Sequence, residues 1–402
     1  MRCPPIAGDS VTIGQGGKFS TDPDSIRQTT WKMTQSIDDR SRSMLRVREE
    51  ARPDGSLARE IEFSDVVFDP LGYAELHEAI LHGPLHIPLH GRGKVVSSNI
   101  KGVEVGQDGR FTTKLESRFT SKSIGLVRGG WLPSAMALKD NSIVFPDRCV
   151  VAELNNRLRG GLSKPDADPD FIDLFADSAI RINPLLFVLE GDRGQNPEPE
   201  TIEGHLHEAV SKLRSALPKA ILVASDAQGL KGVLGLIQDT QPGMARKHDF
   251  LTRLNSKLKS PIGRRDVQAR WDDVLAAADA SGVTRTSLAV VAALSTVVVP
   301  GGKSPARRLL KFDNRYSQAD TYNALSDLRA LELLMHIFAL FPNEHVMLCT
   351  ADKSMALFWA GLQASNFTSV HGRLSFDVAP QDLLPGVSER QWKQALTADV
   401  AS

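Results

Sequence analysis

Four acidic residues occupy positions where they could hold a metal ion: Asp147, Glu190, Asp327 and Asp352. Three of them, Asp147, Glu190 and Asp352, directly follow short apolar runs, and such runs predict buried strands or helix segments that carry the acids to the edge of a core. Acids gathered at one edge repel one another by about 4 kcal/mol per pair at 4 Å with an effective dielectric near 20. A divalent cation removes this repulsion, and oxygen ligands suit Mg²⁺ or Mn²⁺.

The remaining acid lies on the most regular helical pattern in the chain. Leucines recur at three- and four-residue spacing between residues 320 and 341, which predicts an amphipathic helix. Asp320, Asn323 and Asp327 share its polar face. Asp327 precedes Asp352 by 25 residues, enough for the rest of the helix, a loop and one strand, so the two acids can meet. The alternative is that Asp320 and Asp327 are solvated acids on a helix surface.

The chain divides into four parts by composition and pattern. Residues 1–42 are rich in small and polar residues and predict a flexible N-terminal segment. Residues 43–130 predict a mainly β accessory domain. Residues 131–370 alternate strand and helix signals and predict an α/β domain, a parallel sheet flanked by helices, with a large helical insertion at about 218–315. Residues 371–402 form a C-terminal extension.

Individual elements follow from the same patterns. In the β region, hairpins are predicted to join 44–48 to 57–63 and 102–105 to 110–115, with a short helix at 70–81. In the α/β region, strands are predicted at 143–145 and 346–350, and helices at 150–158, 170–179, 199–217 and 354–362. The first of these helices is expected to point Arg157 outward. Gln241-Pro-Gly243 is expected to separate two helices of the insertion.

The amino-acid composition limits which binding partners and which cellular compartment are expected. Lys plus Arg and Asp plus Glu number 48 each, so no global field steers the protein to nucleic acid and any polyanion site must be a local patch. Three cysteines at no metal-type spacing fit a reducing, cytoplasmic environment. The longest apolar run, at 287–300, is too short to span a bilayer as a helix. We therefore expect a soluble cytoplasmic protein that does not bind membranes.

Several stretches resemble the PIN-like nuclease family. Residues 323–334 followed by 346–356 are similar to its closing half, in which an acid on a late helix precedes a strand ending in Thr-x-Asp. Residues 143–154 are similar to its opening strand, aspartate and helix, and residues 183–191 to its segment with the second acid. The resemblance covers about residues 141–365.

The resemblance implies a metal-dependent hydrolase, a nuclease and most simply an endoribonuclease, with Mg²⁺ or Mn²⁺ as its cofactor. Its catalytic and metal-binding residues would be the four acids, which would hold a metal-activated water that attacks the phosphorus. Asn323 and Thr350 would not bind the metal themselves but could orient the acids or the water that do. RNA rather than DNA is the expected partner, and Arg148 or Lys353 could contact a phosphate oxygen.

The sequence departs from the family in two places, and the position of the second acid stays open. Cys149 stands where the family often has Asn. The interval at 200–315 is far longer than in a minimal domain, which implies the helical insertion. Asp192 competes with Glu190 for the role of second acid.

Other interpretations stay open. One is a non-catalytic PIN-like module that binds nucleic acid or protein, and another is a different Mg²⁺-dependent phosphate hydrolase. The β domain could select substrate or bind a protein partner. The basic groups Arg264-Arg265, Arg307-Arg308 and Lys311 could line a nucleic-acid groove or form a solvated helix face. The sequence leaves the oligomeric state open.

Overall fold

The chain folds into two compact units. The computed structural model describes residues 31–36, 44–49, 59–164, 168–191, 194–370 and 373–397. The first unit comprises Met1–Lys122 with Asp168–Phe171, and the second comprises Ser123–Ala167 with Ile172–Ser402. Most of the segment predicted to be flexible at 1–42 lies outside the described residues, which include only strand β1 from it.

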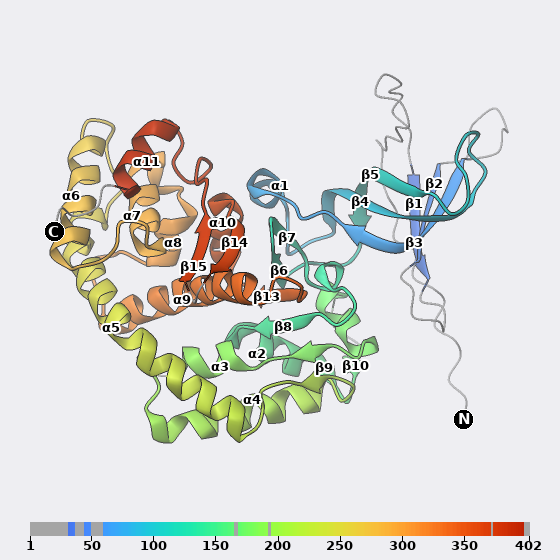
Figure 1. Ribbon diagram of the computed structural model, residues 1–402, viewed down its shortest axis with the longest axis horizontal. Coiled ribbons are helices and arrows are strands. Elements are labelled where there is room, and N and C mark those ends of the chain that lie inside the picture. Colours follow the sequence, from blue (N-terminus) through green and yellow to red (C-terminus); the bar gives the residue numbers. More distant parts are fainter. Residues whose placement is uncertain are drawn as a thin grey trace. The chain divides into compact units, whose positions relative to one another are not determined.

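The smaller unit is built on an antiparallel sheet (Figure 1). Its elements are β1 (Trp31–Ser36), β2 (Met44–Glu49), β3 (Glu60–Phe68), α1 (Tyr73–Glu78), β4 (Leu85–Ser98) and β5 (Asp108–Ser117). The strands pair in chain order from β1 to β5. One face buries a cluster formed by Leu45, Val47, Ile61, Phe63, Val95 and Phe111. The predicted mainly β character of this region is confirmed.

One of the two predicted hairpins is wrong. Residues 102–105 do not form a strand, and β5 pairs instead with the long strand β4, from Leu85 opposite Ser117 to Lys94 opposite Asp108. The reason is burial, because β4 places alternate apolar residues in the core whereas residues 102–105 are largely exposed. The other hairpin, β2 with β3, has the predicted antiparallel pairing.

The larger unit contains a mixed sheet. Its strands are β6 (Ile124–Val127), β7 (Gly130–Pro133), β8 (Ile143–Pro146), β11 (Arg181–Ile182), β12 (Ile221–Leu222) and β13 (Val346–Thr350). The spatial order is β12-β11-β8-β13-β6-β7. The first four run parallel, as predicted, but β6 and β7 add an antiparallel edge. Gly125 allows β6 to approach β13, because a Cβ there would lie 2.5 Å from the Met347 sulfur.

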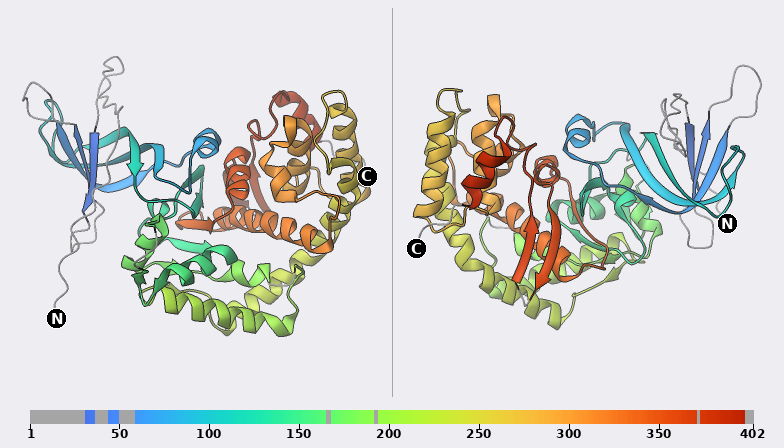
Figure 2. Two further views of the ribbon diagram at one scale, coloured as in Figure 1. Left: turned by 180° about the vertical axis from the view of Figure 1, so that it is seen from behind. Right: turned by 45° about the horizontal axis from the view of Figure 1, so that its top comes forward.

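Helices surround this sheet (Figure 2). They are α2 (Arg148–Arg157), α3 (Leu185–Glu190), α4 (Pro199–Ala216), α5 (Ala227–Leu258), α6 (Val267–Ala280), α7 (Leu288–Val298), α8 (Pro305–Leu310), α9 (Gln318–Leu340), α10 (Lys353–Leu362) and α11 (Glu389–Thr397). Shorter pieces are η1 (Ser134–Ala137), η2 (Phe171–Asp177), η3 (Pro300–Gly302), β9 (Leu158–Arg159), β10 (Leu162–Ser163), β14 (Ser365–Val370) and β15 (Arg373–Asp377). The helix predicted at 170–179 is the 3₁₀ segment η2.

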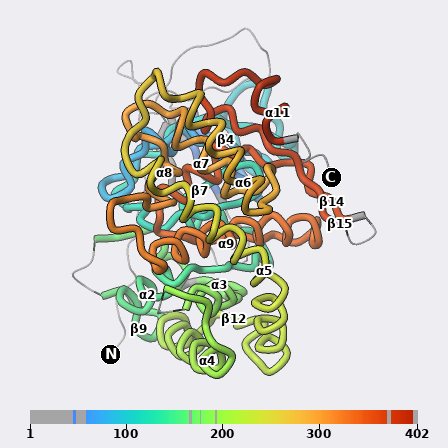
Figure 3. Tube along the Cα trace, turned by 90° about the vertical axis from the view of Figure 1, so that its left-hand side faces the viewer, coloured from blue at the N-terminus to red at the C-terminus, as the bar shows by residue number. Residues whose placement is uncertain are grey.

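The expected helical insertion starts with α5, which runs without interruption through residues 241–243 (Figure 3). The predicted break there is wrong. Pro242 removes one backbone donor from the helix, but α5 buries an apolar stripe that includes Met244, Phe250, Leu251 and Leu254. Lys247 also pairs with Glu332 of α9 at 2.5 Å. Tertiary packing therefore outweighs the local effect of the proline.

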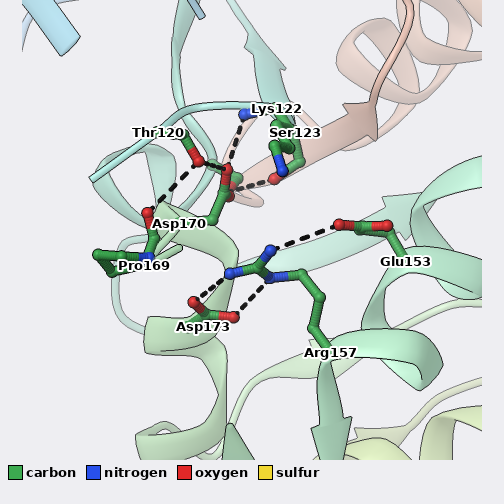
Figure 4. Close-up of polar contacts among 9 residues, drawn as sticks. Thr120, Lys122, Ser123, Glu153, Arg157, Pro169, Asp170 and Asp173 are labelled. Carbon is green, nitrogen blue, oxygen red and sulfur yellow. Dashed lines mark hydrogen bonds and ion pairs between the residues drawn. The ribbon is translucent and has the colours of Figure 1, made fainter. Parts of the chain in front are cut away.

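Arg157 of α2 points inward rather than to solvent, and Figure 4 shows its partners. Its guanidinium donates two hydrogen bonds to Asp173 of η2, at 2.8 and 2.7 Å, and lies 3.6 Å from Glu153. In the smaller unit, the same figure shows Thr120 donating to Asp170 at 2.6 Å. The carboxylates explain why these polar groups tolerate burial.

The apolar run at 287–300 forms α7, which is buried on all sides. A helix that is apolar all round belongs inside a core. No described helix combines the length and the apolar composition that crossing a bilayer requires.

Candidate metal centre

The carboxyl ends of β8 and β13 bring two of the predicted acids to neighbouring positions. These strands are parallel neighbours, with Pro146 opposite Cys349, and the backbone N–H of Asp147 donates to the carbonyl of Cys349 at 3.0 Å. Asp352 follows two residues after the end of β13. Ligands of parallel sheets collect beyond such strand ends.

Both acids also begin a helix. Asp147 is the N-cap of α2, and its Oδ1 accepts from the N–H of Val150 at 2.7 Å. Asp352 is the N-cap of α10, and its Oδ1 accepts from Ser354 at 2.6 Å and Met355 at 3.2 Å. In the described structure Oδ2 of Asp352 makes no hydrogen bond, so capping leaves an oxygen available.

Thr350 connects the two acids. Its buried hydroxyl accepts from the N–H of Asp352 at 3.0 Å and donates to the carboxylate of Asp147. A hydroxyl that accepts one bond and donates another fixes both groups at once. This is the kind of contact expected of a group that orients the acids. Asn323 lies one turn before Asp327 and is half-buried, but no described hydrogen bond joins its side chain to an acid.

Three of the acids line one pocket. Asp147 comes from the β8–α2 junction, Glu190 from the last turn of α3, and Asp327 from the middle of α9. The other lining residues are Leu186, Leu189, Ser326, Arg329, Ala330, Leu333 and Met355. Asp352 is not in the lining, although Met355 of the same helix is. Asp320 instead accepts from Ser317 in a capping box, so its predicted alternative role as an ordinary helix-surface acid fits.

The pocket disfavours negative charge. Desolvation raises the pKa of Asp147 from 3.8 to about 7, with the charge of Glu190 adding to the rise and hydrogen bonds from Thr350 and the backbone opposing it. Burial likewise raises the pKa of Asp327 well above its usual range. The charges of Asp352, Glu190 and Asp147 raise this pKa further, whereas the positive charge of Lys311 lowers it. Burial also raises the pKa of Glu190. These carboxylates would release protons more readily if a cation were bound among them.

Cys149 lies close enough to all four acids for their charges to affect its thiol. Burial raises the pKa of its thiol to about 11, and the charges of Asp147, Glu190, Asp327 and Asp352 each raise it further. Their fields thus overlap at one sulfur atom. With such a pKa the thiol stays protonated near neutral pH, which makes it unsuited to act as a nucleophile.

The ionisable acids that line the pocket offer only carboxylate oxygens as metal ligands, and such ligands suit a hard divalent cation. Within the ranges that the structure describes, no three Asp, Glu, His or Cys side chains converge closely enough to form a ready-made metal site. Asp147, Glu190 and Asp327 thus line one pocket without forming a close group of ligands.

Arg329 is a pocket residue that the sequence did not single out. It is 3% exposed, and its guanidinium donates to the carbonyl of Leu189 at 2.7 Å, to the hydroxyl of Tyr322 at 3.2 Å and to Asn196 at 3.0 Å. The Leu189 carbonyl also accepts from Tyr322 at 2.9 Å. Arg329 thereby anchors the end of α3, one residue before Glu190.

Arg148, the predicted phosphate contact, has several partners within the protein. Its guanidinium lies 4.4 Å from the ring centroid of Phe187 and 3.7 Å from Glu208, while its backbone N–H donates to Glu190 at 3.2 Å. Its Nη1 atom is buried without a hydrogen bond. Asp192, the competing second acid, lies outside the described residues.

No protein-family model matches the chain, and neither a curated protein nor a solved structure matches it significantly.

Proposed function

We propose that the protein is a metal-dependent nuclease with a PIN-like domain, which hydrolyses phosphodiester bonds, most simply in RNA. The observation that supports this best is the shared pocket of Asp147, Glu190 and Asp327, three acids from distant parts of the chain, with Asp352 acting on it electrostatically. The parallel pair β8 and β13, each followed by an acid and a helix, agrees with the family pattern.

The residues in and beside the pocket would have different roles in this reaction. Asp147, Glu190, Asp327 and Asp352 would hold Mg²⁺ or Mn²⁺, which when bound lowers the pKa of a water and neutralises charge on the phosphate. Thr350 fixes Asp147 relative to Asp352. Arg329 fixes the end of α3 and so the position of Glu190. Apolar lining residues such as Leu186 and Leu333 limit the access of bulk water.

Two conservative substitutions test the proposal. Asp147→Asn and Asp352→Asn should abolish Mn²⁺-dependent cleavage of single-stranded RNA while the protein stays folded, because asparagine caps helices about as well as aspartate. Asp320→Asn is the matched control, since Asp320 caps α9 outside the pocket. EDTA should stop cleavage by the wild type. Undiminished cleavage by both Asp147→Asn and Asp352→Asn would refute the nuclease assignment.

A non-catalytic PIN-like binding module is the second candidate. It is favoured by the absence of a ready-made metal cluster among the described residues. A wild type that binds RNA or DNA but cleaves neither with Mg²⁺ or Mn²⁺ would support it. Metal-dependent hydrolysis of a small phosphomonoester, without cleavage of nucleic acid, would instead support the other phosphate-hydrolase reading.

A further inference from the structure

Strand β5 forms one edge of the antiparallel sheet in the smaller unit (Figure 1). It pairs with β4 on one side, from Asp108 to Ser117. Within the part of the chain that the structure describes, no strand pairs with its other side. Just beyond β5 the chain is covered, because the N–H of Thr120 donates to the carbonyl of Pro169 at 2.8 Å. The open edge therefore has the length of β5.

The backbone groups that face this open edge belong to alternate residues of β5. The carbonyl of His90 accepts from the N–H of Asp69 at 2.8 Å, so the backbone groups of His90 point away from β5. Thr112 lies opposite His90 and forms a non-hydrogen-bonded pair with it, so the backbone groups of Thr112 face the open edge. The other residues with this direction are Asp108, Arg110, Lys114 and Glu116. Unpaired N–H and carbonyl groups along an edge form a template for another strand.

The charges of β5 select one register for pairing with a second copy of the chain. In an antiparallel pair centred on Thr113, Arg110 lies opposite Glu116 of the second copy, and the same pair recurs on the other side of the two-fold axis. A shift of two residues in one direction places Arg110 opposite Lys114, and a shift in the other direction places Lys114 opposite Lys114. Opposite charges across a strand pair stabilise it, whereas like charges destabilise it. Shifts by one residue would turn the unpaired backbone groups of one copy away from those of the other.

The core face of β5 fits the same register. Phe111, Thr113 and Leu115 are buried on this face. In the pair centred on Thr113, Phe111 lies opposite Leu115 of the second copy, which joins apolar side chains. Thr113 is 2% exposed, and its hydroxyl has no hydrogen-bond partner in the described structure. A change of rotamer would let the Thr113 hydroxyls of the two copies bond each other, so pairing would satisfy a buried polar group.

We propose that β5 pairs with β5 of a second copy, antiparallel and centred on Thr113, and so joins two five-stranded sheets into one across a two-fold axis. The backbone groups that face the open edge would then exchange hydrogen bonds between the copies. Such an assembly is closed at two copies, because the same surface of each copy is used once. The inference concerns assembly through the smaller unit and is independent of the proposed nuclease function.

Charge reversal provides a sharp test, with sedimentation equilibrium of the full chain over a concentration series as the measurement. Arg110→Glu puts an acid opposite Glu116, and Glu116→Lys puts a base opposite Arg110. Each occurs twice in the dimer, so each should raise its dissociation constant about tenfold. The double variant Arg110→Glu/Glu116→Lys restores opposite charges and should recover the wild-type constant. Both variants should fold, because the 4.0 Å contact of Glu116 with His86 joins exposed groups and adds little stability.

Further variants separate strand pairing from general charge effects. Glu203→Lys makes the same charge change at an exposed residue of α4 and should leave the dissociation constant unchanged. Thr112→Pro removes an N–H that faces the open edge but is not used in the ladder with β4, so it should weaken the dimer while circular dichroism stays that of the wild type. Hydrogen exchange of peptides that span β5 should become slower as the wild-type concentration rises.

The outcomes decide the proposal whether or not the protein cleaves nucleic acid. A dimer that is weakened by each single reversal and restored by the double variant would support it. A wild type that stays monomeric at its highest soluble concentration would overturn it, and the open edge would then be available to a strand of a different protein. A dimer that neither single reversal weakens would form through another surface and would also overturn it. So would a double variant as weak as the single ones, since Arg110 and Glu116 would then not face each other.

Discussion

In the metal-free protein, Asp147 should make folding less stable as the pH rises. Its pKa is raised from 3.8 to about 7, chiefly because the folded protein desolvates its carboxylate. The folded state therefore binds more protons than the unfolded state between these pH values, and stability falls with rising pH. The penalty is absent below pH 3.8 and complete above about pH 7, where it amounts to about 4 kcal/mol.

Asp147→Asn isolates this effect. Asparagine keeps the N-cap of α2 but does not titrate. The gain in free energy of unfolding relative to the wild type should be larger at pH 8 than at pH 5 by about 2 to 3 kcal/mol. Comparing the two pH values cancels every contribution of the substitution that does not titrate.

Urea unfolding in EDTA, followed by tryptophan fluorescence, provides the measurement. The two units can unfold separately, so the relevant transition is the one reported by Trp131 and Trp359, both buried in the larger unit. Asp320→Asn is the control. Hydrogen bonds from Ser317 lower the pKa of Asp320, so it is ionised at both pH values and should show no such difference. Parallel stability curves for wild type and Asp147→Asn would refute the desolvation argument.

Three more predictions concern the same pocket. Mn²⁺ should raise the melting temperature of the wild type more at pH 8 than at pH 5, because Asp147 holds a proton at pH 5, and Asp327→Asn should remove the effect in a thermal-shift assay. Thr350→Val deletes the hydroxyl that lowers the pKa of Asp147, so the acidic limb of the pH–rate profile should move to higher pH; an unmoved limb would contradict this. Arg329→Gln leaves its buried partners unpaired and should lower the free energy of unfolding by about 3 kcal/mol, with reduced cleavage, as measured by urea unfolding and single-turnover assays.

The sequence was informative where an apolar run ended in an acid. The runs before Asp147 and Asp352 are the neighbouring strands β8 and β13, and each acid begins a helix. Short apolar runs cannot by themselves distinguish a strand from a helix. The run before Glu190 is a helix, α3, so this acid reaches the pocket from a helix end.

Arg329 was beyond the reach of sequence patterns. Its partner Leu189 is 140 residues away in the chain, and an arginine in an otherwise regular helix ordinarily suggests exposure. The same limit applies to Lys311, since no local pattern predicts a left-handed cap without glycine or asparagine. The antiparallel edge formed by β6 and β7 was missed because these strands are four residues each and precede the α/β pattern.

The strand order has a consequence for biosynthesis. β8 and β6 are close in sequence but do not pair, because β13 lies between them. A ribosome adds the intervening stretch of about 200 residues, from Pro146 to Val346, in about 10 to 40 s. During that interval β6 and β8 lack the strand that lies between them, so each has an unpaired edge. Unpaired strand edges favour non-native pairing or chaperone binding. A chain truncated before residue 346 should therefore be protease-sensitive around β8, and the acids Asp147 and Asp352 cannot come together before β13 has been synthesised.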